Sequence, residues 1–324
     1  MKKLKVLSFF AGVGGIDLGF EQTKKFKTVY ANEFDENAKT TFEANFNIKV
    51  DCRDINIVKT DEVPDCDVII GGFPCQAFSI AGYRQGFNDE KGRGNLFFEM
   101  CRFIKDKKPR VVFLENVKNL VGHDNGNTFR VILESLEKLG YHVKYQVLNA
   151  KDYGNVPHGR ERIYIVGFLN KEEYKNFEFP KPIKLTTKLS DVISFNEEVD
   201  DKLYYTSDRC NFYDIIQKEI VKQETIYQWR RVYVRENKSN VCPTLTANMG
   251  TGGHNVPLIL TYDNRIRKLS PRECFNLQGF PKDYVLPELS NIHLYKQAGN
   301  SVVVPVIRRI AESIFNSIEI FKEE

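Results

Sequence analysis

Short apolar runs alternate with longer amphipathic segments through the first half of the chain. Several runs are almost continuously apolar, which is typical of strands buried on both faces of a parallel sheet. The predicted strands are Leu4–Phe10, Thr28–Ala31, Val68–Gly71, Arg110–Leu114, His142–Leu148 and Ile163–Phe168. The predicted helices between them are Ile16–Phe20, Glu36–Asn45, Leu96–Lys105 and Thr128–Leu139. This alternation predicts an α/β fold, a doubly wound and mostly parallel sheet whose ligands bind beyond the carboxyl ends of the strands.

The alternating pattern ends near a linker-like segment, Phe177–Pro182. The residues that follow are irregular and rich in turns, as at Asn248–Gly253, which favours a loop-dominated recognition surface. Apolar residues return with helical spacing in Val302–Ile320, and we expect a closing helix there after Pro305. The sequence therefore predicts two domains, the first formed by residues 1–185 and 290–324 and the second by residues 186–289.

Composition places the chain among soluble globular proteins, with 42% hydrophobic and 28% charged residues. The 47 basic and 43 acidic residues leave a net charge of +4, which is too mild to indicate a polyanionic partner by itself. A nucleic-acid surface would have to be local. The segment Gln228–Lys238 combines four basic residues with Trp229 and Tyr233, a pattern that is equally typical of a solvated charge cluster.

The seven cysteines are scattered from Cys52 to Cys274 without a C-x-x-C pair. This spacing favours free thiols in a reducing cytoplasm and argues against a zinc site, so no metal is expected. No stretch approaches the roughly 20 apolar residues of a membrane span, and the basic N-terminus lacks the apolar region of a signal peptide. We therefore expect a cytoplasmic protein without a membrane partner.

A glycine turn, Phe9–Gly15, follows the first predicted strand and opens a helix. In this context glycine lets a cofactor approach the backbone closely, although a tight turn without a ligand has the same pattern. Glu33 lies just past the second strand, where an acidic side chain in a nucleotide-binding fold accepts hydrogen bonds from ribose. Asp54 follows the next predicted strand region and could accept from an adenine amino group. Taken singly, both are more often surface carboxylates.

The segment Gly71-Gly72-Phe73-Pro74-Cys75-Gln76 places a thiol on a loop just beyond the carboxyl end of an apolar strand. Such loops carry active sites in open sheets. Most cysteines pack as small inert hydrophobes, but a thiolate here would be a nucleophile. Glu115 follows a neighbouring predicted strand, so its carboxyl group can face the same pocket.

Two further polar segments are ambiguous on their own. His158–Arg162 precedes an apolar strand, and strand alternation would send Arg160 and Arg162 to the same side, although a pair of surface arginines is the common case. Gln297–Val302 sets polar and glycine residues before the closing helix and could be a plain turn.

These segments occur in a fixed order, with one more that contains Arg267 and Glu273. The ordered set is Phe10-x-Gly12-x-Gly14-Gly15, Gly72-Phe73-Pro74-Cys75-Gln76, Glu115-Asn116-Val117, Arg160-x-Arg162, Arg267-Lys268-Leu269-Ser270-Pro271-Arg272-Glu273 and Gln297-x-Gly299-Asn300-Ser301. Together they closely resemble the bacterial DNA (cytosine-5)-methyltransferase family, of the type II modification kind. The resemblance leaves mainly residues 170–265 uncovered. His158 stands where the family often has glutamine, and Asp54 lacks the glycine that often precedes it, which puts cofactor affinity and local loop geometry in doubt.

The resemblance implies a Rossmann-like domain that binds S-adenosylmethionine and releases S-adenosylhomocysteine, beside a smaller irregular target-recognition domain. It assigns Glu33 to the ribose, and Asp54 and Ile55 to the adenine. The cofactor-binding residues that it implies are Phe10, Gly12, Gly14, Glu33, Asp54, Ile55, Leu96 and Asn300.

For catalysis the resemblance implies that the Cys75 thiolate adds to carbon 6 of cytosine. Glu115 would hydrogen-bond ring N3 and the exocyclic amine, and Arg162, with Arg160 nearby, would position the ring. Carbon 5 of cytosine is a poor nucleophile in an aromatic ring, so covalent addition at carbon 6 is what makes it reactive. A stacked base cannot reach these groups, and the target cytosine must therefore be flipped out of the duplex.

The implied partner is double-stranded DNA carrying a short specific site, which the sequence does not name. The loop Gln76–Asn95 is the expected clamp on the flipped base, and the segment around residues 186–266 is expected to read the site. The candidate DNA-binding residues are Ser79, Arg84, Arg93, Arg230, Arg231, Arg235, Thr244 and Asn248. Four of them, Arg230, Arg231, Arg235 and Asn248, are the candidate base readers, because arginine and asparagine make bidentate contacts with guanine and adenine.

We expect a monomer without an obligate protein partner, in a bacterial cytoplasm and associated with the nucleoid through DNA, and a cognate restriction endonuclease for the same site is possible. Two alternatives stay open. One is a transfer-RNA cytosine-5-methyltransferase on the same scaffold. Phe73 and the separate second domain favour the DNA enzyme instead. The other is a catalytically silent DNA-binding protein, which would be expected to lack Cys75 or Glu115.

Overall fold

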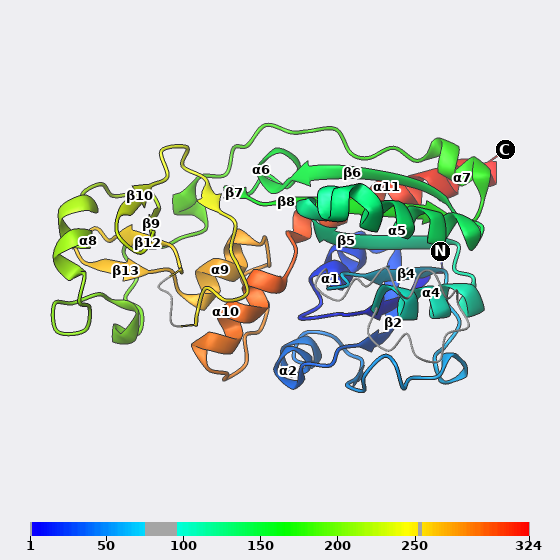
Figure 1. Cartoon of the computed structure of the whole chain (residues 1–324), viewed down its shortest axis with the longest axis horizontal. Helices are drawn as coiled ribbons and strands as arrows, with labels where there is room; N and C mark the ends of the chain where they lie inside the picture. The colour runs from blue at the N-terminus through cyan, green and yellow to red at the C-terminus, as the bar shows by residue number, and fades with distance from the viewer. Residues whose placement is uncertain (1, 75–95, 252–254, 324) are drawn as a thin grey trace. The chain divides into compact units, whose positions relative to one another are not determined.

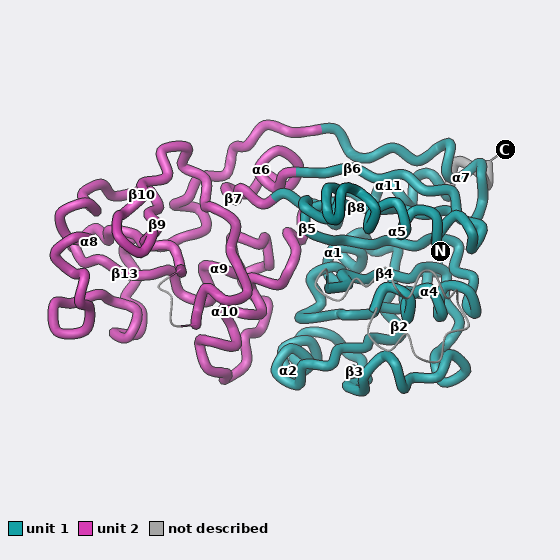
Figure 2. The backbone as a smooth tube through the Cα atoms, in the orientation of Figure 1, with its two compact units in different colours: residues 1–148, 161–181, 306–324 teal, residues 149–160, 182–305 magenta. Residues whose placement is uncertain are grey.

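The structure is a computed structural model that describes residues 2–74, 96–251 and 255–323, with the side chains beyond residue 318 left out. Its contacts divide the chain into two compact units (Figure 2). Unit 1 comprises residues 1–148, 161–181 and 306–324, and unit 2 comprises residues 149–160 and 182–305. This division differs from the predicted domains mainly in residues 149–160 and 290–305, which belong to unit 2.

A seven-stranded sheet forms the centre of unit 1 in the described part of the chain, with strand order β3-β2-β1-β4-β5-β8-β6 (Figure 1). The strands are β1 (Leu4–Phe9), β2 (Phe26–Asn32), β3 (Val50–Asp51), β4 (Val68–Gly71), β5 (Val111–Val117), β6 (His142–Asn149) and β8 (Glu161–Phe168). The pairs from β3 to β5 are all parallel, whereas β8 pairs antiparallel with β5. The predicted α/β fold with a mostly parallel sheet is confirmed.

Helices cover both faces of this sheet. The described helices of unit 1 are α1 (Gly15–Gln22), α2 (Glu36–Glu43), α4 (Leu96–Lys107), α5 (Asn127–Lys138), α7 (Lys171–Asn176) and most of α11 (Val304–Glu323), with the 3-10 helices η1 (Thr60–Glu62) and η3 (Lys118–Gly126). Helices α4 and α5 pack on one face, where Ile69 and Leu114 are fully buried. On the other face Phe20 of α1 lies 5.3 Å from Phe113, measured between ring centroids.

Two boundaries differ from the prediction for identifiable reasons. The strand predicted to end at Leu114 continues as β5 to Val117, because β8 pairs with it through Glu115↔Tyr164 and Val117↔Arg162. Helix α11 begins at Val304 rather than after Pro305. Proline is tolerated in the first turn of a helix, where its missing N–H has no intrahelical partner to lose.

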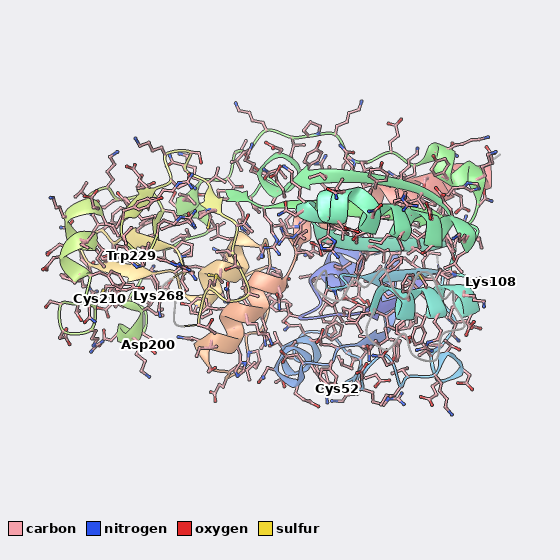
Figure 3. All side chains as sticks on the ribbon, in the orientation of Figure 1. Cys52, Lys108, Asp200, Cys210, Trp229 and Lys268 are labelled. Atoms are coloured by element: carbon pink, nitrogen blue, oxygen red, sulfur yellow. The ribbon has the colours of Figure 1, made fainter. Side chains whose placement is uncertain are left out.

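Unit 2 contains short elements joined by long irregular connections. Its described elements are α6 (Ala150–Tyr153), β7 (His158–Gly159), η4 (Leu189–Asp191), η5 (Asp201–Leu203), α8 (Tyr213–Glu219), β9 (Tyr227–Trp229), β10 (Val234–Glu236), β11 (Cys242–Pro243), β12 (Leu258–Leu260), β13 (Ile266–Lys268), α9 (Pro271–Leu277) and α10 (Asn291–Asn300). Strands β10-β9-β12-β13 form one sheet, and β7 pairs in parallel with β11. The core of the larger sheet includes Trp229 and Cys210, both labelled in Figure 3.

A buried ion pair holds β13 to α9 in unit 2. The Arg267 guanidinium, with no exposed surface, donates to both carboxylate oxygens of Glu273 at 2.8 Å and also to the Ser194 carbonyl. Glu273 completes a capping box with Ser270 at the start of α9. The segment from Arg267 to Glu273, identified by its motif, therefore has a structural role within unit 2.

Unit 1 buries a titratable group, Asp17 of α1, completely. Its carboxyl oxygens accept hydrogen bonds from the Ser8 hydroxyl at 3.0 Å and the Thr28 hydroxyl at 3.1 Å. Burial raises the pKa of Asp17 to about 7, although the two hydroxyl hydrogen bonds oppose this shift. The folded protein therefore holds the Asp17 proton more tightly than the unfolded chain does.

Because the folded-state pKa is raised, stability is greatest below the unfolded pKa near 4 and falls as the pH rises to about 7. We expect the substitution Asp17→Asn to remove this loss, about 4 kcal/mol in the free energy of unfolding between pH 4 and pH 8. Urea unfolding of the wild type and Asp17→Asn between pH 4 and pH 8 measures this change in stability. The control is Asp61→Asn, at an exposed position of η1. Equal pH dependence in the wild type and Asp17→Asn would contradict the assignment.

Candidate functional site

The glycine turn after β1 is held against Glu33 at the end of β2. Phe10, Gly12 and Gly14 adopt positive φ angles of 54°, 55° and 76°, a backbone conformation that favours glycine at the last two positions. One Glu33 carboxylate oxygen accepts from the Gly12 N–H at 2.8 Å, and the other accepts from the Asp35 N–H at 2.8 Å. The predicted glycine turn and the predicted ribose carboxylate therefore lie in direct contact.

The surroundings of this turn leave room on one side only. A Cβ atom added at Gly12 would meet nothing within 4 Å, whereas one at Gly14 would collide with the Phe46 ring at 2.3 Å. Open space thus faces the Gly12 backbone, as a ligand-binding glycine turn requires. Phe34, directly after Glu33, has 72% of its surface exposed, and the sequence interpretation missed it. An aromatic residue next to a nucleotide-site carboxylate was the available signal.

Three other predicted cofactor residues pack on one hydrophobic cluster of unit 1. Ile55 is 3% exposed within that cluster, and Phe10 and Leu96 pack against it. The Arg102 guanidinium of α4 donates to the Ile55 carbonyl at 3.0 Å, which ties the turn after β3 to the helix that Leu96 begins. Asp54 is exposed, and its carboxylate accepts from the Asn56 N–H at 2.9 Å.

The ends of β4 and β5 bring Gly72 and Phe73 against Glu115 and Asn116. Gly71 pairs with Leu114 in the parallel register. A Cβ atom added at Gly72 would come within 3.3 Å of a Glu115 carboxylate oxygen, and the Asn116 amide donates to the Phe73 carbonyl at 2.8 Å. The chain is therefore fixed next to Glu115 just before Pro74. Cys75 itself, the predicted nucleophile, lies outside the described residues.

Glu115 and Arg162 form an ion pair across the antiparallel strands β5 and β8. The Arg162 Nε lies 3.0 Å from Glu115 Oε1, and the two side chains are only 13% and 10% exposed. Limited solvent access strengthens such a charge interaction and restricts the rotamers of both groups. The structure thus brings together two of the predicted catalytic residues, which are held in a defined orientation.

Arg160 has different partners from Arg162, which strand alternation does not predict. Strand β7 ends at Gly159 and β8 begins at Glu161, so Arg160 falls in the break between them. Its guanidinium, 3% exposed, donates to the backbone carbonyls of Leu245, Gly299 and Ser301, all in unit 2. In the structure Arg160 fixes backbone segments of unit 2.

The predicted cofactor residue Asn300 ends α10 in unit 2 and is exposed. Gly299 beside it cannot be replaced without moving the backbone, because an added Cβ atom would lie 2.2 Å from the Thr246 carbonyl carbon. The motif that contains Gly299 is therefore explained in part by close backbone packing within unit 2.

The predicted DNA-binding residues are distributed unevenly. Ser79, Arg84 and Arg93 lie outside the described residues. Arg230, Arg231 and Arg235 are exposed around the β9–β10 hairpin. The Thr244 hydroxyl donates to the Gly159 carbonyl at 2.6 Å, and the Asn248 side chain accepts from the Thr246 hydroxyl at 2.9 Å. Both residues are exposed.

The described cysteines are poor candidates for a nucleophile. Desolvation by burial raises the pKa of Cys52 to about 11 and that of Cys66 to about 12. Burial also raises the thiol pKa of the remaining four, which are Cys101, Cys210, Cys242 and Cys274. A raised pKa leaves little thiolate at neutral pH, which disfavours these six thiols as nucleophiles.

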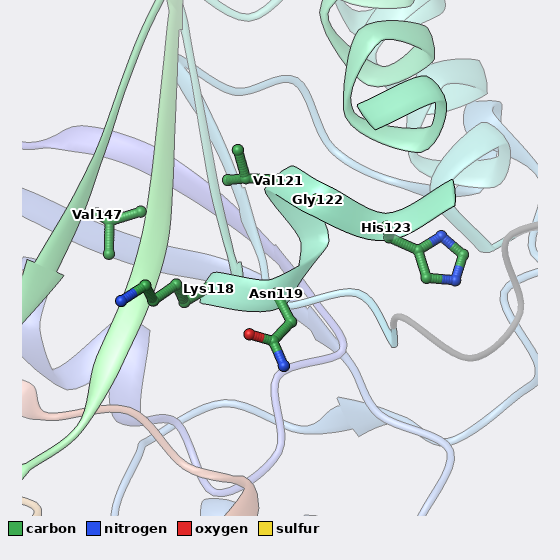
Figure 4. Close-up of a pocket in the computed structure, with 6 residues that line it drawn as sticks. All are labelled: Lys118, Asn119, Val121, Gly122, His123 and Val147. Atoms are coloured by element: carbon green, nitrogen blue, oxygen red, sulfur yellow. The ribbon is translucent and has the colours of Figure 1, made fainter. Parts of the chain in front are cut away.

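A surface pocket of about 610 Å³ follows β5 along the chain (Figure 4). It is lined by Lys118, Asn119, Val121, Gly122, His123 and Val147. The Lys118 ammonium on its wall is held by both carboxylate oxygens of Glu161, at 3.0 and 3.1 Å. Sequence motifs did not indicate this pocket, because its lining comes from η3 and β6, which are brought together only by the fold.

Within the described ranges there is no cluster of three or more histidine, cysteine or acidic side chains suited to a metal ion. None of the described helices is long and apolar enough to cross a membrane.

The family model for C-5 cytosine-specific DNA methylases matches residues 4–316, almost the entire chain. The chain belongs to this family. It is accordingly a C-5 cytosine-specific DNA methyltransferase, as the ordered motifs indicated.

Curated members of the methylase family are similar to nearly the whole of this chain. The type II methyltransferase M.Bsp6I of Bacillus sp. (strain RFL6) is 66% identical over 97% of this chain and 99% of its own. M.SsoII of Shigella sonnei is 43% identical over 98% of this chain and 81% of its own. M.HhaI of Haemophilus parahaemolyticus is 39% identical over 97% of this chain and 95% of its own.

Solved structures share the methylase fold. The DNMT2 protein of Spodoptera frugiperda aligns with a TM-score of 0.74 and 19% identity over 97% of this chain and all of its own. The methyltransferase EhMeth of Entamoeba histolytica aligns with a TM-score of 0.72 and 17% identity over 98% of this chain and 99% of its own. The Rossmann-like methyltransferase fold expected from the motifs is confirmed.

Proposed function

We propose that the enzyme transfers a methyl group from S-adenosylmethionine to carbon 5 of a cytosine flipped out of a short, specific duplex site. The high identity to type II methyltransferases supports a role as the modification half of a restriction-modification system. A cognate endonuclease for the same site, a monomeric state and an association with the nucleoid belong to this proposal. The observation that carries the chemical part is the Glu115–Arg162 ion pair beside Gly72 and Phe73.

The residues of unit 1 fit the cofactor. The open space over the Gly12 backbone and the Glu33 carboxylate suit a ribose, and the exposed Phe34 ring suits stacking on adenine. Asp54 and Ile55 would meet the adenine, with Phe10, Gly14 and Leu96 completing the part of the site in unit 1. Asn300 belongs to unit 2 and stays a cofactor candidate from its motif alone. When bound, S-adenosylmethionine supplies a methyl group on a sulfonium ion, which carbon 5 of the activated cytosine takes up.

The chain's own residues activate the base. The Cys75 thiolate adds to carbon 6, and the electron pair of the 5,6 double bond moves to carbon 5. Glu115 hydrogen-bonds N3 and the exocyclic amine, which stabilises the charge that develops on the ring. Arg162 holds Glu115 and positions the ring. After methylation a base removes the carbon 5 proton, and expulsion of the Cys75 thiolate restores the aromatic ring.

Elimination supports Cys75 as the nucleophile. Seven cysteines are present in the chain, and the six that the structure describes have raised pKa values caused mainly by burial. Cys75 follows Pro74 directly, and the preceding Phe73 carbonyl is fixed by Asn116 beside Glu115. Arg160 enters the proposal as a positioning residue for the backbone around Leu245 and Gly299.

The proposal also assigns a role to each of the two predicted domains. Residues 1–185 and 290–324 form the catalytic domain in the proposal, and residues 186–289 form the target-recognition domain and hinge. Ser79, Arg84 and Arg93 contact the phosphate backbone around the flipped base, and Thr244 and Asn248 contribute to the DNA surface of unit 2.

Transfer of tritiated methyl groups tests the proposed substrate. We expect incorporation into unmethylated duplex DNA, because the family and the separate recognition segment favour DNA, and incorporation into transfer RNA at no more than the background of a no-enzyme control. Bisulfite sequencing of the product DNA then gives the modified base and its context. Incorporation into transfer RNA but not into DNA would contradict the proposal.

A further inference from the structure

Asn32 is the last residue of β2 and lies between the ends of two neighbouring strands. In the parallel register it pairs with Phe9 of β1 on one side and with Asp51 of β3 on the other. The segments that follow these three strands are the glycine turn, Glu33 and residues 52–55, and all three belong to the proposed cofactor site. Asn32 itself is only 2% exposed, so its side-chain amide needs hydrogen-bond partners within the protein.

The Asn32 side-chain amide holds the loop that follows β3. Its nitrogen donates to the backbone carbonyl of Asp51 and to that of Arg53, each at 2.9 Å. Both amide hydrogens are therefore used, one on each carbonyl. The orientation of the amide group is fixed as well, because an amide oxygen in place of the nitrogen would face two carbonyl oxygens without a donor between them. These two hydrogen bonds set the path of the chain directly before Asp54 and Ile55.

The Asn32 backbone holds the glycine turn on the other side. Its carbonyl accepts from the Ala11 N–H at 3.1 Å, one residue before Gly12. The next residue, Glu33, accepts from the Gly12 N–H through its carboxylate, and its own N–H donates to the Asp51 carbonyl at 3.1 Å. Asn32 thus contacts both the glycine turn and the loop after β3, the two segments that flank the Glu33 carboxylate.

Strand β3 gives this loop little support of its own. It consists of Val50 and Asp51 alone, and these make its two pairs with β2. The Arg53 guanidinium binds both carboxylate oxygens of Asp51, at 2.9 and 2.7 Å, but its side chain is 46% exposed, and exposed ion pairs contribute little. Hydrogen bonds from a buried donor are costly to leave unmade, so the Asn32 amide is the stronger constraint on the start of the loop.

We propose that Asn32 is a positioning residue of the cofactor site, which fixes the adenine loop relative to the ribose carboxylate. This inference rests on the proposed function. Asn32 acts through its neighbours: Glu33 follows it directly, and Asp54 and Ile55 follow the Arg53 carbonyl that it binds. A loop that is held in place before binding loses less conformational entropy when the ligand arrives. Loss of the amide should therefore weaken the binding of every ligand that carries adenosine.

The expected effect differs from that of a residue needed only for the fold. S-adenosylmethionine and S-adenosylhomocysteine share the adenosine group and differ in the methyl group, so both dissociation constants should rise by the same factor. KM for S-adenosylmethionine should rise as well, whereas kcat at saturating cofactor should stay close to that of the wild type, because the lost interaction contributes equally to ground state and transition state. Binding of duplex DNA should not change.

The experiment titrates Asn32→Ser and Asn32→Asp with S-adenosylhomocysteine in a calorimeter, without DNA. Serine has one short donor, which cannot reach both carbonyl oxygens, and aspartate keeps the size of the side chain but has no donor when it is ionised. We expect Kd to rise about 5- to 150-fold in Asn32→Ser, the range for two hydrogen bonds. The rise in Asn32→Asp should be at least as large, since its carboxylate faces two carbonyl oxygens.

Asn276→Ser is the matched control, because Asn276 of α9 is a partly buried asparagine of unit 2 whose amide also donates to a backbone carbonyl, that of Val192 at 3.1 Å. We expect it to lower the melting temperature and to leave the Kd for S-adenosylhomocysteine unchanged. A folded Asn32 variant that binds S-adenosylhomocysteine with wild-type affinity, or an equal loss of affinity in Asn276→Ser, would overturn the inference.

A measurement on the wild type makes the test independent of whether the variants fold. Both side-chain amide protons of Asn32 should exchange with solvent at least about tenfold more slowly than those of Asn47, which is exposed. Equal exchange rates, measured by NMR without cofactor, would overturn the inference. Failure of the wild type to bind either S-adenosylmethionine or S-adenosylhomocysteine would instead overturn the proposed function, so the two failures are distinguishable.

Discussion

Replacing Cys75 with serine should abolish methyl transfer while leaving binding of DNA and S-adenosylmethionine within about threefold of the wild type. A serine hydroxyl does not ionise at neutral pH, so addition to carbon 6 would lose its nucleophile, and removal of an enzyme nucleophile can cost about 10⁶-fold in kcat. We expect single-turnover transfer of tritiated methyl groups to fall by at least about 10³-fold. Gel-shift and calorimetric titrations measure the two binding constants.

Cys52→Ser is the matched control, because Cys52 is partly exposed and burial raises its pKa to about 11. A thiol with so little thiolate at neutral pH should not contribute to catalysis. We expect this variant to keep wild-type turnover. Substantial activity in Cys75→Ser, or loss of activity in Cys52→Ser with binding intact, would contradict the assignment of the nucleophile.

The substitution Glu115→Gln should lower kcat by about 10²- to 10⁴-fold with little change in KM for DNA. Glutamine keeps the size of the side chain, but it removes the carboxyl group that pairs with Arg162 at 3.0 Å. It also cannot transfer a proton to ring N3, as a carboxylic acid can, when negative charge develops on the ring. An interaction made mainly in the transition state affects kcat rather than KM. Steady-state kinetics on duplex DNA measure both parameters.

Glu161→Gln provides the comparison, since Glu161 is on the strand that pairs with β5 but is exposed and bound to Lys118 at 3.0 Å. Exposed ion pairs contribute little, and we expect near wild-type kinetics. An equal loss of kcat in Glu115→Gln and Glu161→Gln would mean that the effect comes from the surface charge near the strand ends rather than from a group that acts on the base.

The predictable part of the fold is the part set by local pattern. The near-continuous apolar run at Val68–Gly71 predicted both ends of β4 correctly. A strand that is buried on both faces is recognised from its own apolar residues, without information from other parts of the chain. The end of β5 was placed three residues early, since its continuation to Val117 depends on pairing with β8, which is distant in the sequence. The assignment of residues 149–160 to unit 2 likewise depends on non-local contacts such as β7 with β11.

In the candidate site, too, local motifs predicted which residues are involved, but not their tertiary contacts. Motifs identified Gly12, Glu33 and Glu115 as candidates, but not the hydrogen bond from the Gly12 N–H to Glu33 or the packing of Gly72 on Glu115. Strand alternation did not indicate the partners of Arg160, because a break in the strand and three carbonyl groups distant in the sequence determine its contacts. Side-chain direction at such positions is set by tertiary contacts, which a local pattern does not contain.

Covalent trapping tests the central claim most directly. Duplex DNA with 5-fluorocytosine at the target position carries a fluorine that cannot leave as a cation, so elimination stalls after methyl transfer and the enzyme stays bound to the base. We predict a stable protein–DNA adduct that forms only with S-adenosylmethionine present and that peptide mass spectrometry maps to Cys75. An adduct mapped to another residue, or methylation of normal DNA by an enzyme that forms no adduct, would contradict the covalent mechanism.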